Sequence, residues 1–336
     1  MCIVKNNILT QPSKLPGFMT LKTPVLFLTF NRPAITQRVF EAIRKAKPSR
    51  LFIAADGPRA DHPGDRQLCS EARRVAAEVD WPCEVLTLFR EKNLGCKKAV
   101  SSAIDWFFSQ VTKGIILEDD CLPHHDFFTF CDSMLEYYED DERVWVITGN
   151  NFQHSRKRGN AAYYFSKYNH CWGWASWRRS WQFYRGDLPF WQEWNHSTDW
   201  FLKMQDRVEQ RYWTDIFERV RSNEIDSWAY PWTASVWYHG GLTVTPNVNL
   251  VTNIGLGPDA THTISKKYKE GLPVNSLGPL IHPKMVEQDK KADRYVFDHH
   301  FGGLRLRPHW RVLKLPRIIA NKIVRTISSR SQLSAV

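Results

Sequence analysis

Short apolar runs alternate with helical patterns through the first 150 residues, and this alternation limits the possible folds more than any other feature. The apolar runs are rich in β-branched residues and indicate strands at 24–30, 50–55, 83–89, 114–117 and 143–148. Stripes of apolar residues at helical spacing lie between them and begin at Ile35, Leu68 and Val100. Repeated strand–helix units predict an α/β fold with a mostly parallel central sheet and helices on both faces.

The composition narrows the class of protein. The 336 residues are 43% hydrophobic and 24% charged, which is typical of a globular chain with a substantial core. No apolar run reaches the roughly 18 to 20 residues of a membrane span, and the N-terminus has no pattern of a secretion signal. The seven cysteines lack metal-ligand spacing and indicate reduced thiols. These features predict a cytoplasmic protein.

The net charge of +11 is concentrated near the C-terminus. Residues 299–336 contain no Asp or Glu, and they supply Arg305, Arg307, Arg311, Lys314, Arg317, Lys322, Arg325 and Arg330. Ile319, Ile323 and Ile327 recur at helical spacing among these basic residues, which indicates a basic amphipathic helix. Such a helix lies on an anionic membrane surface or packs on its own domain, and residues 305–330 fit either interpretation. No nucleic-acid-binding module accompanies the charge, so we do not expect a nucleic-acid partner.

Residues 114–120, with the sequence GIILEDD, end an apolar strand in three consecutive carboxylates. In an open α/β sheet the carboxyl end of a strand faces the ligand crevice. Clustered carboxylate oxygens suit a hard divalent ion such as Mg²⁺ or Mn²⁺. The sequence therefore predicts a cation site at Glu118, Asp119 and Asp120, and the alternative interpretation is a solvated acidic turn.

Polar residues also follow the other predicted strands at the same edge of the sheet. They are Thr29, Asn31, Arg32, Asp56, Asn93 and Lys97. A nucleotide at this edge would need an acceptor for its base or ribose, which Asp56 can supply, and positive charge near phosphate, which Arg32 or Lys97 can supply. The sequence Asp56-Gly57-Pro58 is also a good turn, and the chain has neither a Gly-rich dinucleotide fingerprint nor a P-loop.

These pieces, in this order, resemble the N-acetylglucosaminyltransferase I family and its bacterial relatives among the GT-A glycosyltransferases. The resemblance covers roughly residues 24–260 and runs through PVLFLTFNRP, the strand ending AADG, GIILEDDC and VWVITGNN. It implies a GT-A (Rossmann-like) nucleotide-diphospho-sugar transferase fold. Residues 20–150 would form its nucleotide-sugar-binding half, residues 151–300 the Trp-rich acceptor and catalytic half of the same domain, and residues 301–336 a basic tail.

The resemblance also implies roles for single residues. Arg32 and Asp56 would contact the nucleotide. Asp120 would bind the metal, Mn²⁺ or Mg²⁺, while Asp119 faces the donor sugar and Glu118 the ribose. The motif reads Glu-Asp-Asp where the wider fold more often has Asp-x-Asp, and this family is known to use that variant.

Tryptophan is concentrated in the second half of the chain, where eleven of the fifteen lie between Trp172 and Trp237. Aromatic faces pack against sugar rings but also dominate ordinary cores, so we expect about two thirds of these residues to be structural. Trp172, Gly173 and Trp174 are the expected exception. A glycine permits close backbone approach, and the resemblance places a Gly-Trp element beside the donor pocket.

An inverting transfer needs a carboxylate that accepts the proton of the acceptor hydroxyl. Asp226 and Glu193 are the two candidates. Asp226 is preferred, because its segment EIDSW is similar to an acidic-aromatic stretch of the bacterial relatives, whereas FWQEW around Glu193 resembles the family's aromatic-acidic loop. His262 is a candidate metal or phosphate contact, with a structural role as the alternative.

We therefore predict a metal-dependent, inverting glycosyltransferase of bacterial surface polysaccharide synthesis. The sugar would move from a nucleotide diphosphate donor, UDP-N-acetylglucosamine by resemblance, to a saccharide or lipid-linked saccharide acceptor. The enzyme would be cytoplasmic or peripheral on the cytoplasmic face of the inner membrane. One alternative is a sugar-phosphate nucleotidyltransferase, which usually has a Gly-rich loop where this chain has TFNRP. The other is a carbohydrate-binding protein of degenerate GT-A type, which would not need the carboxylates.

Overall fold

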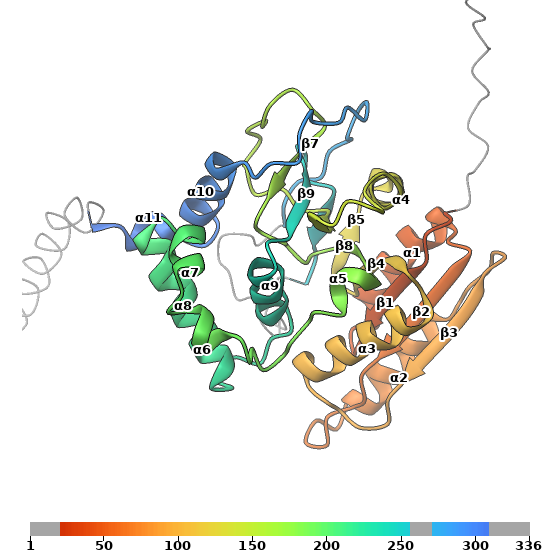
Figure 1. The fold of residues 1–336 in the computed structure, drawn as a ribbon. Coiled ribbons are helices and arrows are strands. Elements are labelled where there is room, and N and C mark those ends of the chain that lie inside the picture. The colour runs from red at the N-terminus through yellow and green to blue at the C-terminus, as the bar shows by residue number, and fades with distance from the viewer. Residues whose placement is uncertain (1–20, 256–270, 309–336) are drawn as a thin grey trace, which may run out of the picture.

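The first half of the chain alternates strands and helices as the sequence predicts (Figure 1). The structure is a computed structural model that describes residues 21–255 and 271–308. The elements of the first half are β1 (Val25–Thr29), α1 (Pro33–Ala46), β2 (Arg50–Ala55), α2 (Asp65–Ala76), β3 (Glu84–Phe89), α3 (Cys96–Gln110), β4 (Lys113–Glu118), β5 (Cys121–Pro123), α4 (His125–Tyr137) and β6 (Val144–Thr148). Helix α1 begins at Pro33, because proline has no N–H to leave unpaired in the first turn.

The second half has shorter elements and more helix. They are β7 (Tyr163–Ser166), β8 (Trp174–Trp177), α5 (Arg178–Trp181), α6 (Trp191–Trp194), α7 (Thr198–Lys203), α8 (Arg207–Arg221), α9 (Ala229–Tyr238), β9 (Leu242–Pro246), β10 (Val251–Asn253), α10 (Lys290–His299) and α11 (Gly303–Leu306). No helix within residues 21–255 and 271–308 has both the length and the apolar composition of a membrane span.

Eight strands from both halves form one central sheet in the order β3-β2-β1-β4-β8-β6-β9-β7. Strands β3, β2, β1 and β4 are parallel to one another, and β6 is parallel to β9. Strand β8 lies between β4 and β6 and is antiparallel to both. Strand β7 is antiparallel to β9 at the edge. A separate two-stranded pairing joins β5 to β10. The prediction of an α/β fold with a mostly parallel sheet is thus confirmed.

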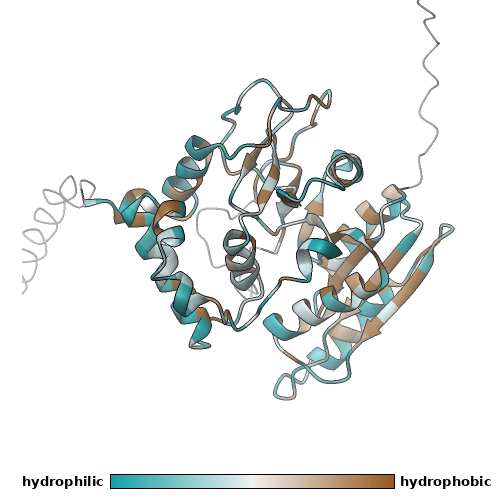
Figure 2. Cartoon of the chain, viewed as in Figure 1, coloured by the Kyte–Doolittle hydropathy of each residue, from teal (hydrophilic) through white to brown (hydrophobic). Residues whose placement is uncertain are grey.

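Alternate residues of the central strands enter two different hydrophobic cores, as the pleat of a strand requires. Val25 and Phe27 of β1 pack in one cluster with residues of α1 and α4, such as Val39 and Met134. Leu26 and Leu28 pack on the opposite face with α3 and the helices of the second half. Helices therefore cover both faces, and Figure 2 shows the strands as the most hydrophobic part of the cartoon.

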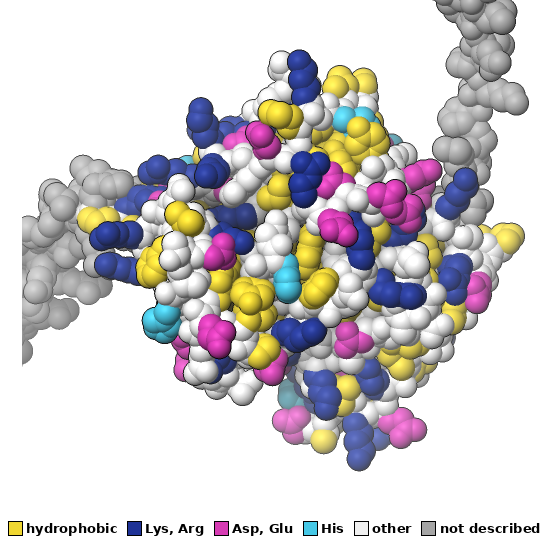
Figure 3. All heavy atoms as spheres, viewed as in Figure 1, with side chains coloured by type: hydrophobic (Ala, Val, Ile, Leu, Met, Phe, Trp, Pro, Cys, Tyr) yellow, Lys and Arg dark blue, Asp and Glu magenta, His cyan; other side chains and the backbone are white. Residues whose placement is uncertain are grey.

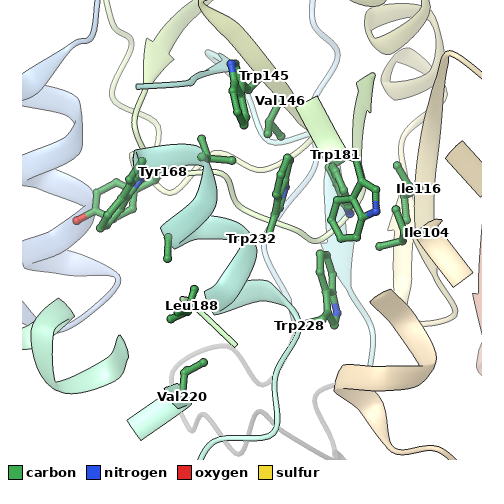
Figure 4. Close-up of a cluster of buried hydrophobic side chains, with 14 of the residues drawn as sticks. Ile104, Ile116, Trp145, Val146, Tyr168, Trp181, Leu188, Val220, Trp228 and Trp232 are labelled. Carbon is green, nitrogen blue, oxygen red and sulfur yellow. The ribbon is translucent and has the colours of Figure 1, made fainter. Parts of the chain in front are cut away.

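The core on the second face is built largely from tryptophan (Figure 4). Trp174 stacks on Trp228 with ring centroids 5.6 Å apart, and Trp181 lies 5.0 Å from Trp232. Ten of the eleven Trp between positions 172 and 237 are buried, and Trp172 alone of this group is partly exposed. Most of these tryptophans therefore serve as core, as predicted. On the face that Figure 3 shows, basic and acidic side chains are interspersed.

Candidate functional site

A cavity of about 910 Å³ opens at the carboxyl ends of β1, β2 and β4. The strand register explains why polar residues from distant positions meet there. Thr29 pairs with Ala55 and Leu28 with Glu118, so all three strands end at nearly the same level. The predicted site residues that line the cavity are Thr29, Arg32, Asp56, Asn93, Glu118, Asp119, Asp120, Trp172 and Asp226.

Arg32 joins the acidic run to the loop after β1. Its guanidinium donates to both Asp119 and Asp120, and the N–O distance to Asp120 is 3.2 Å. The second carboxylate oxygen of Asp119 accepts the backbone N–H of Phe30 at 3.3 Å. The side chain of Asp119 is only 4% exposed, whereas those of Arg32 and Asp120 are 23% and 18% exposed. Asp119 is therefore held in the wall, and Asp120 is the more accessible carboxylate.

Electrostatics favour a cation at this place. Burial and the carboxylates of Asp120 and Asp119 raise the pKa of Glu118. Burial also raises the pKa of Asp119, although Arg32 opposes the shift. Burial alone would lower the pKa of Arg32, but Asp119 and Asp120 outweigh it and raise that pKa. When all three carboxylates are ionised, they exceed the charge of the one guanidinium by two, which one divalent ion would neutralise. The donors are the oxygens that Mg²⁺ and Mn²⁺ prefer.

Asp56 fixes the loop that follows β3. Its carboxylate accepts the backbone N–H groups of Gly57 at 2.8 Å and Leu94 at 3.0 Å. Asn93 donates in turn to the carbonyl of Gly57 at 2.9 Å. A Cβ at Gly57 would lie 2.4 Å from the carbonyl carbon of Lys92, so only glycine allows this approach. Burial raises the pKa of Asp56, although these backbone hydrogen bonds oppose the shift.

Asp226 lines the cavity from the turn between α8 and α9, in the second half of the chain. Its Oδ2 lies 3.3 Å from where a Cβ would stand on Gly95, at the start of α3. Asp226 is therefore beside the loop that Asp56 holds. The other candidate base, Glu193, lies exposed on α6 and does not line this cavity.

The three residues of the Trp-Gly-Trp element have different surroundings. Trp172 lines the cavity, and its backbone N–H donates to Asn150 at 3.0 Å. Gly173 has a positive φ of 73°, and a Cβ there would lie 2.8 Å from Val251. Trp174 is 1% exposed in the tryptophan core and is absent from the cavity wall. Only Trp172 of the three is placed to contact a ligand by its side chain.

The remaining predicted site residues lie elsewhere or outside the described residues. Asn31 donates to Asp65 at 2.8 Å and does not line the cavity. Lys97 does not line it either, and its Cε lies 3.6 Å from where a Cβ would stand on Gly186. His262 lies outside the described residues, so its prediction stays open.

Several lining residues were not singled out from the sequence. They are Arg59, Arg90, Asn150, Tyr168, Asn169, His170, Trp213, Tyr230, Asn253 and Phe301, among others. Tyr168, Asn169, His170 and Phe301 come from loops of the second half, where no periodicity marks them. A polar residue between aromatic neighbours, as in Tyr168-Asn169-His170, is the signal that the sequence offers.

A second group of side chains with metal-binding potential lies at the start of α4, outside the cavity wall. His124, His125 and Asp126 bring ligand atoms within 4.8 Å of one another. The Nε2 of His125 lies 2.7 Å from one oxygen of Asp126, and the other oxygen accepts the hydroxyl of Ser276 at 2.8 Å. Asp126 is thus already used to hold the segment at residue 276 onto α4.

No family model and no curated protein matches the chain. Among solved structures it is similar to mannosyltransferase PcManGT from Pyrobaculum calidifontis in complex with GDP-Man and Mn²⁺, at 15% identity and a TM-score of 0.34, over 49% of this chain and 47% of that chain. The chain thus spans about half the length of that mannosyltransferase.

Two further similarities cover more of the chain. One is to a UDP-glucose pyrophosphorylase complexed with UDP-glucose, at 9% identity and a TM-score of 0.34, over 67% of this chain and 90% of that chain. The other is to mouse xyloside xylosyltransferase 1, at 8% identity and a TM-score of 0.33, over 66% and 83% of the two chains. None of the three carries the name of the N-acetylglucosaminyltransferase I family, so that narrower resemblance stays a prediction.

Proposed function

We propose that the protein is a metal-dependent, inverting glycosyltransferase that moves a sugar from a nucleotide diphosphate to a saccharide acceptor. One observation carries the proposal. Glu118, Asp119 and Asp120 line the same cavity as Asp56 and as Asp226, which comes from a turn in the second half of the chain. Transfer from a charged donor to a neutral hydroxyl requires an acidic cluster that can hold a cation and a separate carboxylate that can accept a proton.

The donor side of the cavity is the wall built by the first half of the chain. Asp56 and Asn93 line the part beside β2 and β3, where a base or ribose would lie. Arg32 supplies positive charge next to the acidic run. A divalent ion held by Asp120 would neutralise the charge of the departing diphosphate. UDP-N-acetylglucosamine is the donor that the sequence resemblance favours, and Mn²⁺ and Mg²⁺ both suit the oxygen donors.

Asp226 is the better candidate for the base. In the proposed reaction its carboxylate accepts the proton of the acceptor hydroxyl while that oxygen bonds to the anomeric carbon. The bond from the anomeric carbon to the diphosphate breaks at the same time, and the nucleoside diphosphate leaves. Glu193 could perform this step only if the exposed helix α6 moved to the cavity.

The test compares Asp226→Asn with Glu193→Gln in a transfer assay. Asparagine is nearly isosteric with aspartate but cannot accept the proton, so turnover should fall by roughly 10² to 10⁴. Affinity for UDP, measured by calorimetry with Mn²⁺, should change little. Glu193→Gln is the matched control and should retain turnover. Normal turnover in Asp226→Asn would remove it from the chemistry, and loss of turnover in Glu193→Gln alone would pass the role to Glu193.

A sugar-phosphate nucleotidyltransferase is the competing activity. Its Gly-rich loop after the first strand would occupy the place where this chain has Arg32, whose guanidinium is engaged by Asp119 and Asp120. The two activities release different products. A panel of nucleotide sugars with Mn²⁺ should yield a nucleoside diphosphate by slow hydrolysis, and pyrophosphate release from a nucleoside triphosphate and a sugar phosphate would contradict the proposal.

We also propose that the basic tail joins the enzyme to an anionic membrane surface, as expected for polysaccharide synthesis on the cytoplasmic face. Arg307 does not take part in this contact. It is 7% exposed, and its guanidinium lies 2.7 Å from Asp206 and 2.6 Å from Asp298. Arg305 lies exposed on α11, and the remaining basic residues of the tail, from Arg311 to Arg330, lie outside the described residues. Arg307 therefore anchors the tail's starting point to the domain.

A further inference from the structure

Asn169 is a buried amide without a partner in the wall of the cavity. Asn169 is 7% exposed, and neither its Nδ2 nor its Oδ1 has a hydrogen-bond partner among the described residues. Asn169 lines the cavity on the side of the second half. A buried amide that makes no hydrogen bond destabilises the fold, so its presence calls for a compensating role.

The backbone around Asn169 is held firmly, in contrast to its side chain. Before it, the N–H of Lys167 donates to Asp293 at 3.1 Å, and that of Tyr168 donates to Ser166 at 2.9 Å. After it, the carbonyl of His170 accepts the hydroxyl of Thr148 at 2.7 Å. The backbone that carries the amide is therefore held in place, as the framework of a binding site requires.

Aromatic rings line the same cavity as Asn169. Those that line the cavity are Phe152, Tyr168, His170, Trp172, Trp213 and Phe301. They pack on one another, with centroid distances of 4.4 Å between Phe152 and His170 and 5.0 Å between Tyr168 and Phe301. Aromatic faces of this kind suit the apolar CH faces of a sugar ring.

The part of this wall that residues 150–172 form carries no Asp, Glu, Arg or Lys side chain that would select a charged ligand. Burial lowers the pKa of His170 to about 3, so its imidazole is neutral at physiological pH. The Asp, Glu, Arg and Lys side chains that line the cavity belong to residues 32–120 and 219–226 and not to residues 150–172. An amide among neutral rings offers both a donor and an acceptor to hydroxyl or acetamido groups.

We propose that Asn169 hydrogen-bonds an uncharged sugar ring, the terminal sugar of the acceptor, seated on this aromatic wall. The assignment to the acceptor rests on the proposed function, because that function gives the donor nucleotide to residues of the first half and the acceptor's proton to Asp226 of the second half. Asn169 would determine specificity. A site built to hydrogen-bond a polar ligand group rejects ligands that leave its own polar atoms unpaired.

The test uses Asn169→Leu, which keeps the size of the side chain and removes its polar atoms. Methyl glycosides of glucose, galactose, mannose and N-acetylglucosamine serve as uncharged probes, with glucosamine and glucuronic acid as charged ones. Binding is followed by saturation-transfer NMR. At least one uncharged probe should bind the wild type, more tightly than either charged probe, and its affinity should fall about tenfold or more in Asn169→Leu.

The thermal midpoint gives a second, independent readout. Asn169→Leu should be as stable as the wild type or more stable, because an unpaired buried amide is replaced by an apolar group. Asn151→Leu is the matched control. Asn151 is equally buried at 6% exposure but donates to the carbonyl of Pro246 and accepts the N–H of Gln153, so its loss should lower the midpoint.

Three results would overturn the inference. They are undiminished binding of the uncharged sugars by Asn169→Leu, a fall in its thermal midpoint like that of Asn151→Leu, and a wild type that binds no uncharged probe. UDP with Mn²⁺ is titrated in parallel. Failure of the wild type to bind UDP would contradict the proposed function. The sugar-binding comparison would still test separately whether Asn169 binds an uncharged sugar.

Discussion

Substitution of Arg32 tests how far its positive charge stabilises the carboxylates of Asp119 and Asp120. In Arg32→Gln the carboxylate of Asp119 loses its guanidinium partner while its side chain stays 4% exposed, and only the N–H of Phe30 still donates to it. Removing one partner of a buried ion pair lowers the free energy of unfolding by about 3–5 kcal/mol. Arg32 and Asp120 are partly exposed, so water screens part of this loss. We expect a loss of roughly 3 kcal/mol in the free energy of unfolding at pH 7.

The loss should shrink as the pH falls. The folded-state pKa of Asp119 is already raised by burial, and without Arg32 it rises further. A carboxyl group whose pKa is higher in the folded state binds more protons there, so its penalty is present at high pH and vanishes below the unfolded pKa of about 4. The free energy of unfolding of the variant should therefore be closer to that of the wild type at pH 5 than at pH 8.

Urea unfolding followed by tryptophan fluorescence, in EDTA, measures both effects. Arg50→Gln is the matched control. Its partner Glu84 is 58% exposed, so losing that ion pair should cost no more than about 1 kcal/mol at any pH. A loss below about 1 kcal/mol for Arg32→Gln, or a loss independent of pH, would refute the account. The double variant Arg32→Gln/Asp119→Asn should recover most of the stability, because the unpaired charge is gone.

Three further predictions address the metal, the tail and a buried carboxyl group. Asp120→Asn should weaken Mn²⁺-dependent UDP binding by about tenfold or more without changing the fold; equal calorimetric affinity would remove Asp120 from the site. Truncation after Pro308, which keeps the buried Arg307, should end co-sedimentation with anionic vesicles at low salt, since each lost basic residue contributes about 1 kcal/mol there. Equal sedimentation would favour a tail that packs on the domain. Burial raises the pKa of Asp293 to about 6, so its folded form binds extra protons and its contribution to stability is lost as the pH rises from 4 to 6. In urea titrations, the free energy of unfolding of Asp293→Asn should rise by roughly 3 kcal/mol relative to that of the wild type between pH 4 and pH 6. A difference between the two proteins that does not change with pH would disprove this.

The first half of the fold followed directly from the sequence because its periodicity is regular. Strand β1 and helix α1 occupy the ranges that the apolar runs and Pro33 predict, and the shared edge of the parallel strands then brings Arg32, Asp56 and Glu118 together. The second half could not be placed in this way. Its tryptophans serve the core at nearly every position, so an aromatic cluster does not identify a ligand site by itself.

The directions and partners of individual side chains also could not be predicted from the sequence. Asn31 precedes Arg32 directly, yet it faces Asp65 rather than the cavity, because adjacent loop residues point in different directions. Asn169 was missed for the opposite reason. Nothing in its local pattern shows that both polar atoms lack a partner among the residues that the structure describes, since this depends on packing from distant segments.

The position of β8 has a consequence for how the chain is made. This strand lies between β4 and β6, so both of those strands have an open edge until residue 177 has been synthesised. At typical translation rates, the 59 residues from Glu118 to Trp177 take roughly 3 to 12 s. During that interval the apolar edge of β4 is available for pairing with other nascent chains. Codon usage and chaperone access between β4 and β8 should therefore affect the yield of folded protein.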